Sequence, residues 1–377
     1  MQKNKLILLL FPLVFFACST GKKALQKGNY YQAVTKAVER LKSDPDNAKA
    51  TTVIKEGYPM AIEWSQEELD LTLSSNQAFK WEQTINTMHQ VNRLSDLIRS
   101  TPAARKIIAN PKTFTSELNM AYEKAAEERY QTGIHLLDQN TRESARTAFD
   151  HFYKANQLIP GYENVLNELE TAKNMATYKV IVEAATVQSR TYKLSSEFFY
   201  NQVFEFLHNS YPERSFVNFY SPQQAEDYNI QHPDFIVQME FFDFSVGNVV
   251  RSEKEEQLTK RVKIETKDTT RVSYKTYKAK LKTFSDKVIS GGRLNYRIID
   301  FNTNNLLRDN LIPGSFTWEN QYAIYVGDEQ ALSDQQFELT KNKALPLPPH
   351  QDLFIEFTRP IYDRLSRELN QFFRRYR

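Results

Sequence analysis

Cysteine is nearly absent from this chain. Cys18 is the only cysteine among 377 residues, so the chain can form no internal disulfide and no cysteine metal site. Glycine is also scarce, at 10 residues, and none of them belongs to a phosphate-binding glycine-rich loop. The longest apolar run covers residues 6–17 and is shorter than the about 20 residues that a transmembrane helix needs. The sequence therefore excludes a disulfide framework, a glycine-rich phosphate-binding loop and a transmembrane helix.

Recognisable catalytic motifs are missing as well. The sequence has no H-E-x-x-H and no G-x-S-x-G, and no two of its six histidines are spaced as metal ligands on one helical turn. Ser19 and Lys22 fit S-x-x-K, but they adjoin Cys18, where no pocket can enclose them. We therefore predict no catalytic residue, no metal site and no cofactor. An enzyme whose site is assembled from scattered residues stays as an alternative.

Composition and charge favour a packed protein that does not bind nucleic acid. The formal net charge is only +3, and it falls to +1 without Lys3 and Lys5, so bulk charge predicts no nucleic-acid partner. The 20 tyrosines and 25 phenylalanines are typical of a globular fold. The length is too great for one typical core and predicts two domains.

The N-terminus has the pattern of a secretory signal. Lys3 and Lys5 precede the apolar run 6–17, and the small residue Ala17 stands directly before Cys18. We predict a signal peptide over residues 1–17. The end of the run resembles the lipobox of bacterial lipoproteins, although Phe15 stands where that family usually has leucine. The resemblance implies cleavage before Cys18 and acylation of its thiol; an ordinary signal peptide with an incidental cysteine is the alternative.

The residues after Cys18 bear on location. In lipoprotein sorting, aspartate next to the cysteine favours retention at the inner membrane, so Ser19 favours the outer membrane. Residues 21–23 are Gly-Lys-Lys, whereas some surface-exported lipoproteins have an acidic run there. We expect a chain anchored to the outer membrane by its lipid, on the periplasmic face.

Residues 18–176 are predicted to form a helical domain. Two stretches share a spacing of twelve residues from alanine to proline, Ala33 to Pro45 and Ala148 to Pro160, and Phe152 follows Ala148 by one turn. This resembles the second helix of a tetratricopeptide repeat, in which small residues let paired helices approach and proline ends the helix. A helical hairpin of another kind is the alternative. Between the copies, residues 81–94 form an apolar stripe at helical spacing.

Residues 177–377 are predicted to form a mixed domain, because the apolar period changes near residue 178. Arg293, Asn295 and Arg297 alternate with apolar residues, as on a strand with one exposed face. The glycine pair at 291–292 is interpreted as a turn that leads into this strand. The expected elements are strands over 178–188, 215–220, 233–250, 271–284 and 291–301, and helices over 195–211 and from about 350 to the end.

The C-terminal half resembles the periplasmic domain of curli secretion-channel lipoproteins and the related penicillin-binding-protein activator lipoproteins. Asp300 ends a strand and Thr303 opens the following turn, as in those families, although Asn304 stands where they usually have glycine. The three stretches that carry the resemblance are "PDFIVQMEFFDF", "RLNYRIIDFNTNN" and "GSFTWENQYAIYVGDEQAL".

The insertion at 251–284 is predicted to be a long charged β-hairpin. Charge falls on both faces of its first strand, so no lipid-facing band exists and we infer no pore. Lys278, Lys280 and Lys282 share one face of the second strand. They are interpreted as a solvated sheet edge protected by lysine, with a binding patch as the alternative.

The last helix ends in a basic cluster. Arg374, Arg375 and Arg377 follow an apolar stripe that includes Ile361 and Leu365. One interpretation is a packed terminal helix with a solvated basic face. The other is that these arginines contact an anionic surface, either lipid head groups or an acidic partner.

Taken together, the sequence predicts an α+β chain. A tetratricopeptide-like helical array is followed by a mixed α/β domain with a long charged hairpin and a C-terminal helix. We expect a non-enzymatic lipoprotein scaffold, or an accessory subunit of an envelope assembly or secretion complex. Its partners would be other envelope proteins within a larger complex, and the membrane through its lipid. A regulator of peptidoglycan synthesis, by analogy with the activator lipoproteins, is the alternative.

The anchor gives a direct test. Because Cys18 is the only thiol, the Cys18→Ser variant should lose all lipid label and should leave the membrane fraction or remain uncleaved. Metabolic labelling with a fatty acid, followed by membrane fractionation, measures both. A wild-type chain that carries no label would contradict the prediction.

Overall fold

A computed structural model describes residues 20–188, 192–212, 215–264 and 273–376. The chain divides into two compact units, Met1–Ala176 and Thr177–Arg377. The first is helical in its described part, and the second combines a sheet with helices, so the predicted α+β class is confirmed. Cys18 and Arg377 lie outside the described residues.

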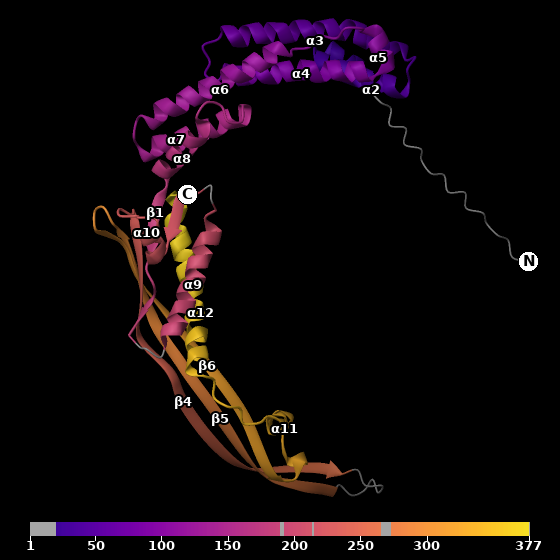
Figure 1. Cartoon of the computed structure of the whole chain (residues 1–377). Helices are drawn as coiled ribbons and strands as arrows, with labels where there is room; N and C mark the ends of the chain where they lie inside the picture. The colour runs from indigo at the N-terminus through magenta and orange to yellow at the C-terminus, as the bar shows by residue number, and fades with distance from the viewer. Residues whose placement is uncertain (1–19, 189–191, 213–214, 265–272, 377) are drawn as a thin grey trace, which may run out of the picture. The chain divides into compact units, whose positions relative to one another are not determined.

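The helical unit is a succession of antiparallel helices (Figure 1). Its longer helices pack in pairs, α2 on α3, α4 on α6, and α6 on α7. The bounds of the described helices are α1 (Lys22–Gln26), α2 (Tyr30–Ser43), α3 (Ala48–Ser74), α4 (Lys80–Ser100), α5 (Pro102–Ile107), α6 (Ser116–Leu137), α7 (Arg142–Leu158) and α8 (Val165–Ala176).

Small residues set the spacing of the α6–α7 pair. Ala148, Phe152 and Ala155 are fully buried on α7, as the alanine spacing predicts. A Cβ added to Gly133 of α6 would lie 2.6 Å from the Phe152 ring. The helices can therefore approach closely only because Gly133 has no side chain. Thr141 begins α7 by accepting a hydrogen bond from the Ser144 amide.

The first alanine-rich copy differs from this arrangement. Ala33 and Ala37 are fully buried on α2, but the helix before α2 has only five residues. α2 instead packs on the helix that follows it, α3, where Gly57 faces Val34. The spacing therefore identified a buried helix face correctly, whereas the helix preceding this copy is too short for a full repeat hairpin.

A buried arginine joins α4, α6 and α7. The Arg129 guanidinium lies 3.5 Å from the Phe79 ring centroid, pairs with Glu82 and lies 3.2 Å from Nδ1 of His151. Burial, and then the charge of Arg129, lower the pKa of His151. Phe79 has a left-handed backbone, with φ of 57°; this rare conformation places its ring against the guanidinium. The predicted stripe on α4 packs beside this cluster, with Ile85 and Met88 buried.

The second unit is built on a mixed sheet in the order β3-β1-β4-β5-β6, with β2 added to β4. β1 is parallel to β3 and β4, while β4, β5 and β6 form an antiparallel meander. The strands are β1 (Tyr178–Val182), β2 (Thr186–Val187), β3 (Val217–Tyr220), β4 (Phe235–Ile264), β5 (Ser273–Asp300) and β6 (Asn305–Gly327).

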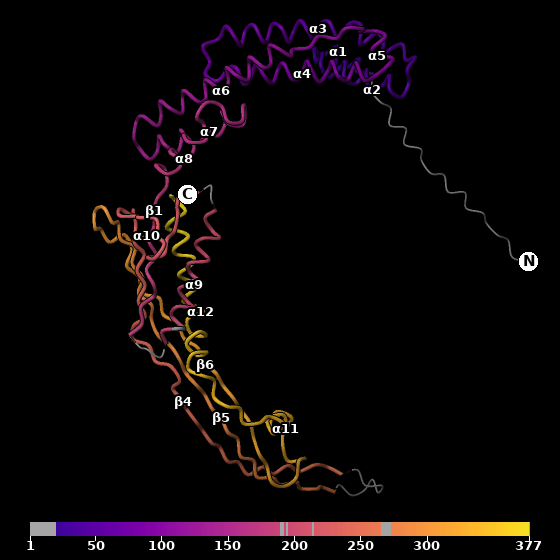
Figure 2. Tube along the Cα trace, in the orientation of Figure 1, coloured from indigo at the N-terminus to yellow at the C-terminus, as the bar shows by residue number. Residues whose placement is uncertain are grey.

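In the described part of this unit, four α-helices accompany the sheet. The bounds are α9 (Lys193–Ser210), α10 (Pro222–Asp227), α11 (Asp334–Lys341) and α12 (His350–Phe373), and short 3-10 turns cover η2 (Glu329–Ala331) and η3 (Arg374–Tyr376). α9 and α12 lie side by side along one face of the sheet (Figure 2). α11 is an element that the sequence did not predict.

The main core lies between the sheet and the α9–α12 pair. Leu294, Tyr296 and Ile298 of β5 point into it and are at most 1% exposed, so the predicted alternation is confirmed. The helices contribute rows that are spaced by one turn, including Phe199, Val203 and Leu207 of α9 and Ile361, Leu365 and Leu369 of α12.

Two glycines let α12 lie directly on the sheet. Gly292 and Gly314 are partners across β5 and β6. A Cβ on Gly314 would collide with the Phe357 carbonyl oxygen and would lie 2.6 Å from Ile361, and a Cβ on Gly292 would collide with Phe244. The interpretation of residues 291–292 as a turn is therefore wrong. Both residues lie inside β5, which runs unbroken through the two strands that the sequence predicted separately.

The far end of the hairpin has its own small core on the opposite face of the sheet. Leu281 and Ala323 are buried there under η2 and α11, together with Leu332. β5 lies between β4 and β6, so Lys278, Lys280 and Lys282 do not form a sheet edge, and that interpretation is wrong. β6 pairs with β5 from Ala279, which lies opposite Gly327, to the other end of β5. This pairing covers the edge of β5 that the sequence predicted to be exposed.

We predict that Gly314→Ala destabilises the mixed unit by about 1–3 kcal/mol, because the added methyl group overpacks a contact with backbone that cannot move aside. Ser315→Ala, which changes the neighbouring exposed position on the other face, is the matched control and should be nearly neutral. Urea unfolding monitored by circular dichroism measures both variants. Equal midpoints for the two would show that α12 does not depend on this close approach.

Candidate functional site

The described residues offer no obvious centre for chemistry. Within them, no three His, Asp or Glu side chains gather closely enough to hold a metal ion. None of their helices has the length and apolar character that a membrane crossing requires. Hollows and exposed faces are therefore the candidates for a site.

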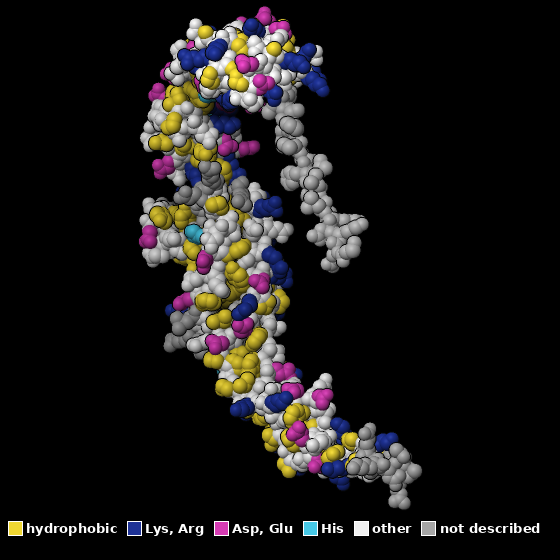
Figure 3. Space-filling model, turned by 90° about the vertical axis from the view of Figure 1, so that its right-hand side faces the viewer, with side chains coloured by type: hydrophobic (Ala, Val, Ile, Leu, Met, Phe, Trp, Pro, Cys, Tyr) yellow, Lys and Arg dark blue, Asp and Glu magenta, His cyan; other side chains and the backbone are white. Residues whose placement is uncertain are grey.

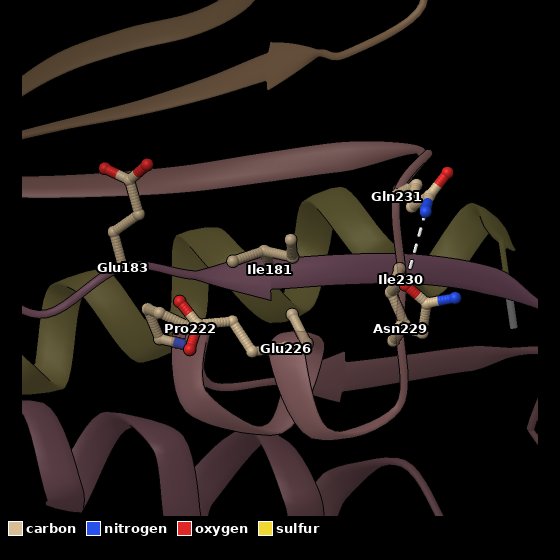
Figure 4. A pocket seen from close by; sticks show the side chains of 8 residues that line it. Ile181, Glu183, Pro222, Glu226, Asn229, Ile230 and Gln231 are labelled. Atoms are coloured by element: carbon tan, nitrogen blue, oxygen red, sulfur yellow. Dashed lines mark hydrogen bonds between the residues drawn. The ribbon is translucent and has the colours of Figure 1, made fainter.

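A hollow of about 420 Å³ lies beside the end of β1 (Figure 4). Figure 4 places the Glu183 carboxylate at one end of the hollow and the side-chain amides of Asn229 and Gln231 at the other, with Ile181 between them. The full lining is Ile181, Glu183, Pro222, Ala225, Glu226, Asn229, Ile230 and Gln231. The hollow thus combines an apolar floor with acceptors and donors at its ends.

Local sequence fixes the α10 side of this hollow. Ser221 accepts a hydrogen bond from the Gln224 amide, and the Gln224 side chain accepts one from the Ser221 amide, which together form a capping box. Pro222 occupies the first helical turn, where its missing N–H costs nothing. Asn229 has φ of 52° and turns the chain back toward β4. The side-chain Nε2 of Gln231 donates to Oδ1 of Asn229 at 3.3 Å.

A second hollow, of about 230 Å³, borders the first at Glu183. Its floor is the face of the sheet opposite to α9 and α12. The strand register brings Gln238 beside Arg297, and Glu240 beside Asn295, on this face. We call Gln238, Glu240, Asn295 and Arg297 the polar face.

Ion pairs extend the polar face across neighbouring strands. Arg293 pairs with Asp243, and Arg297 lies 3.6 Å from Asp309 on β6. These groups are roughly half exposed, so each pair contributes little to stability and stays available to a binding partner. The sequence predicted that Arg293, Asn295 and Arg297 point outward; the carboxylates that accompany them come from the register of β4 and β6.

The hairpin face with the three lysines is a ladder of opposite charges. Lys280 and Lys282 each lie 2.7 Å from an acid of β4, Glu255 and Glu253 respectively. The hydrogen bond to Glu253 is the main cause that raises the pKa of Lys282. In Figure 3, basic and acidic side chains are interspersed over this end of the molecule. Two of the three lysines are therefore internally paired and do not act as an isolated basic patch.

The basic residues at the C-terminus include one, Arg375, that packs on aromatic rings. The Arg375 guanidinium lies 4.2 Å from the Phe372 ring centroid and 5.0 Å from that of Tyr376. Phe372 is buried, so Arg375 covers the end of the core. Arg374 and Arg375 are both exposed. The structure thus brings Arg374 and Arg375 together at the end of α12.

One acid on the same helix has a role that the sequence did not reveal. Glu368 accepts hydrogen bonds from Tyr296 at 2.6 Å, from Asn310 at 2.8 Å and from Arg364 at 2.7 Å. Burial raises the pKa of Glu368, but these three donors outweigh it and lower the pKa overall. Burial, and then the bond to Glu368, raise the pKa of Tyr296. Glu368 therefore fastens α12 to β5 and β6, and it is not available to neutralise Arg374.

The comparisons with known proteins give little guidance. No family model and no curated protein matches the chain. Among solved structures, the chain is similar to the crystal structure of a neuraminyllactose-binding hemagglutinin homolog from Helicobacter pylori. The match has 13% identity and a TM-score of 0.27, and it covers 53% of this chain and 90% of that chain. A likeness of that size carries no argument about function.

The arginines at the end of α12 can be tested with vesicles. Replacing Arg374, Arg375 and Arg377 by Gln should weaken the binding of unlipidated protein to anionic vesicles by roughly 3 kcal/mol at low salt, and by less as salt screens the charges. Arg374→Gln alone, which leaves the Arg375 packing intact, should cost about 1 kcal/mol. Co-sedimentation across a salt series measures both.

The control removes the same charge from the hairpin, by replacing Lys260, Arg261 and Lys263 with Gln. Its binding should match that of the wild type. If the control and the C-terminal triple variant lose equal affinity, binding reflects net charge and the cluster has no special role.

Proposed function

We propose that this chain is a lipid-anchored, non-enzymatic scaffold of a bacterial envelope, held at the periplasmic face of the outer membrane by Cys18. It would serve as an accessory subunit of an assembly or secretion complex. The anchor is supported by the apolar run that ends at Cys18. The resemblance of the C-terminal half to secretion-channel and activator lipoproteins supports the envelope setting.

The polar face is the observation that carries the scaffold role. α9 and α12 cover one side of the sheet, while Gln238, Glu240, Asn295 and Arg297 leave the other side polar and hollowed. Both hollows are shallow and open, as suits a partner's side chains better than an enclosed small substrate. Interfaces between proteins that also exist apart typically contain such mixtures of hydrogen-bonding and charged groups.

The helical unit supports the same role. Its paired helices meet through small residues, as in repeat arrays whose surfaces bind other proteins. Met120 of α6 and Leu166 of α8 are 51% and 61% exposed, which leaves apolar anchors on the outside of this unit. A scaffold of this kind would hold one partner through each unit.

The test of the proposal changes the polar face in cells. Asn295→Ala together with Arg297→Ala should reduce the yield of cross-linked envelope partners about tenfold, because truncated hot-spot residues commonly cost more than 1 kcal/mol each. Quantitative mass spectrometry after cross-linking and affinity capture measures the loss. Thr276→Ala together with Lys280→Ala, on the same strand but in the hairpin, is the matched control.

Circular dichroism and membrane fractionation establish that each variant is folded and located as the wild type is. Recovery of the same partners at the same yield from both double variants would contradict a role for this face. Turnover of a substrate by the purified chain would contradict the non-enzymatic part of the proposal.

A further inference from the structure

The helical unit has an aromatic hollow on its surface. Tyr30 and Tyr31 at the start of α2, together with Trp64 of α3, line a depression of about 360 Å³. Trp64 is 48% exposed, and the two tyrosines are half-buried against the core of α2 and α3. An exposed tryptophan beside two tyrosines is a group of rigid, amphipathic rings, and such rings are enriched where proteins bind one another. We call this depression the aromatic hollow.

Hydrogen-bond donors surround the rings. The side-chain amides of Asn29, Gln32 and Gln90 belong to the lining. The Tyr30 N–H donates to the Gly28 carbonyl oxygen, while the other first N–H groups of a helix have no partner within the helix and Asn29 makes no side-chain cap at the start of α2. The aromatic hollow therefore offers flat apolar faces next to groups that can donate to backbone carbonyls.

The mixed unit carries a segment with the complementary chemistry. Residues 345–349 read Leu-Pro-Leu-Pro-Pro, form no regular element and connect α11 to α12. Leu345 is 55% exposed and Leu347 is 37% exposed. Both leucines precede a proline, which restricts their backbone to extended conformations.

Asn342, shortly before this segment, and Pro349, its last residue, have the dihedral angles of polyproline II. Asn342 has φ of −72° and ψ of 156°, and Pro349 has φ of −56° and ψ of 144°. With three residues per turn, Pro346 and Pro349 fall on one edge of such a helix, which makes no hydrogen bonds within itself. The Pro349 carbonyl oxygen accepts from the Leu353 amide of α12. The segment thus presents exposed apolar side chains, with backbone acceptors between them, in an already ordered form.

We propose that the aromatic hollow binds a leucine- and proline-rich segment in the polyproline II conformation, and that its occupant is residues 345–349 of a second copy of this chain. Aromatic grooves recognise such segments by packing rings on prolines while donors bind the carbonyls. Because the prolines restrict the segment before it binds, little conformational entropy is lost. Each copy carries one hollow and one segment, so the contact is head-to-tail and can join successive copies. This inference does not depend on the scaffold role.

The first experiment uses a fluorescent peptide of residues 342–350 and the full chain in detergent. The peptide should bind saturably, and Trp64→Ala should weaken binding about tenfold, as expected for the loss of a central aromatic anchor. Leu71→Ala, which removes a more exposed side chain from the same helix, is the matched control and should bind as the wild type does. A peptide with Ser in place of Leu345 and Leu347 should not bind.

The second experiment measures self-association of the full chain by sedimentation velocity over a range of concentrations. The wild type should form larger species as concentration rises. Trp64→Ala, and separately Leu345→Ser with Leu347→Ser, should stay monomeric, and a mixture of the two variants should form only dimers, because one intact hollow and one intact segment remain.

Three outcomes would overturn the proposal: no peptide binding by the wild type, equal binding by Trp64→Ala and Leu71→Ala, or self-association that both variants retain. Peptide binding without concentration-dependent association would also exclude the second copy as the occupant. Thermal unfolding verifies that the Trp64→Ala chain remains folded, as its exposed position implies.

Discussion

The contact of α12 with the sheet at Gly292 and Gly314 determines the design of the mixed unit. Two facing positions without side chains let the helix backbone approach the strands, so that Phe357 and Ile361 lie directly on them. Close packing of this kind tolerates little added volume. The contact also commits one face of the sheet to the core, so that beside α12 the side chains that alternate to the other face, such as Asn295 and Arg297, are available to solvent.

A second, polar contact holds the other end of α12. Glu368 accepts from Tyr296 on β5 and Asn310 on β6, so the helix is tied to the two strands that the glycines contact further along. Removing the donors would leave this carboxylate without hydrogen-bond partners, and that costs free energy of folding. The helix is thus fixed in register by shape at one point and by hydrogen bonds at another. The polar face, which includes Arg297 and Asn295 of the same strand, is therefore presented on a rigid support.

Several parts of this arrangement could be predicted from the sequence, because they follow from the short repeat of apolar residues along a strand or a helix. The alternation around Tyr296 identified a strand with one buried face, and the spacing of Ile361 and Leu365 identified the final helix. The glycine pair that includes Gly292 is typical of a turn, and only the close approach of Phe244 and of Phe357 on α12 explains why Gly292 belongs in a strand. Likewise, no local pattern shows that β6 covers β5, so the sequence around Lys280 favours a sheet edge that the structure does not have.

In the candidate sites too, some features follow from local sequence patterns and others only from contacts between distant segments. Outward-pointing Arg297 could be predicted, whereas its neighbours Gln238 and Asp309 come from strands far away in the sequence. The basic residues at 374 and 375 could be predicted, but not that Arg375 rests on Phe372. Contacts between distant segments require the register and the helix docking, and neither is contained in a local pattern.

The hairpin shows how the fold supports strands that reach beyond the helices. A ribbon without a buried face is marginally stable in water, and the cluster of Leu281, Ala323 and Leu332 under η2 and α11 supplies that face. Its other face carries the charge ladder of Lys280 with Glu255 and Lys282 with Glu253. Exposed pairs of this type add little stability, but charges along a strand hinder pairing with foreign strands. The cluster under η2 and α11 therefore stabilises the hairpin, while the charges on the hairpin's other face oppose aggregation.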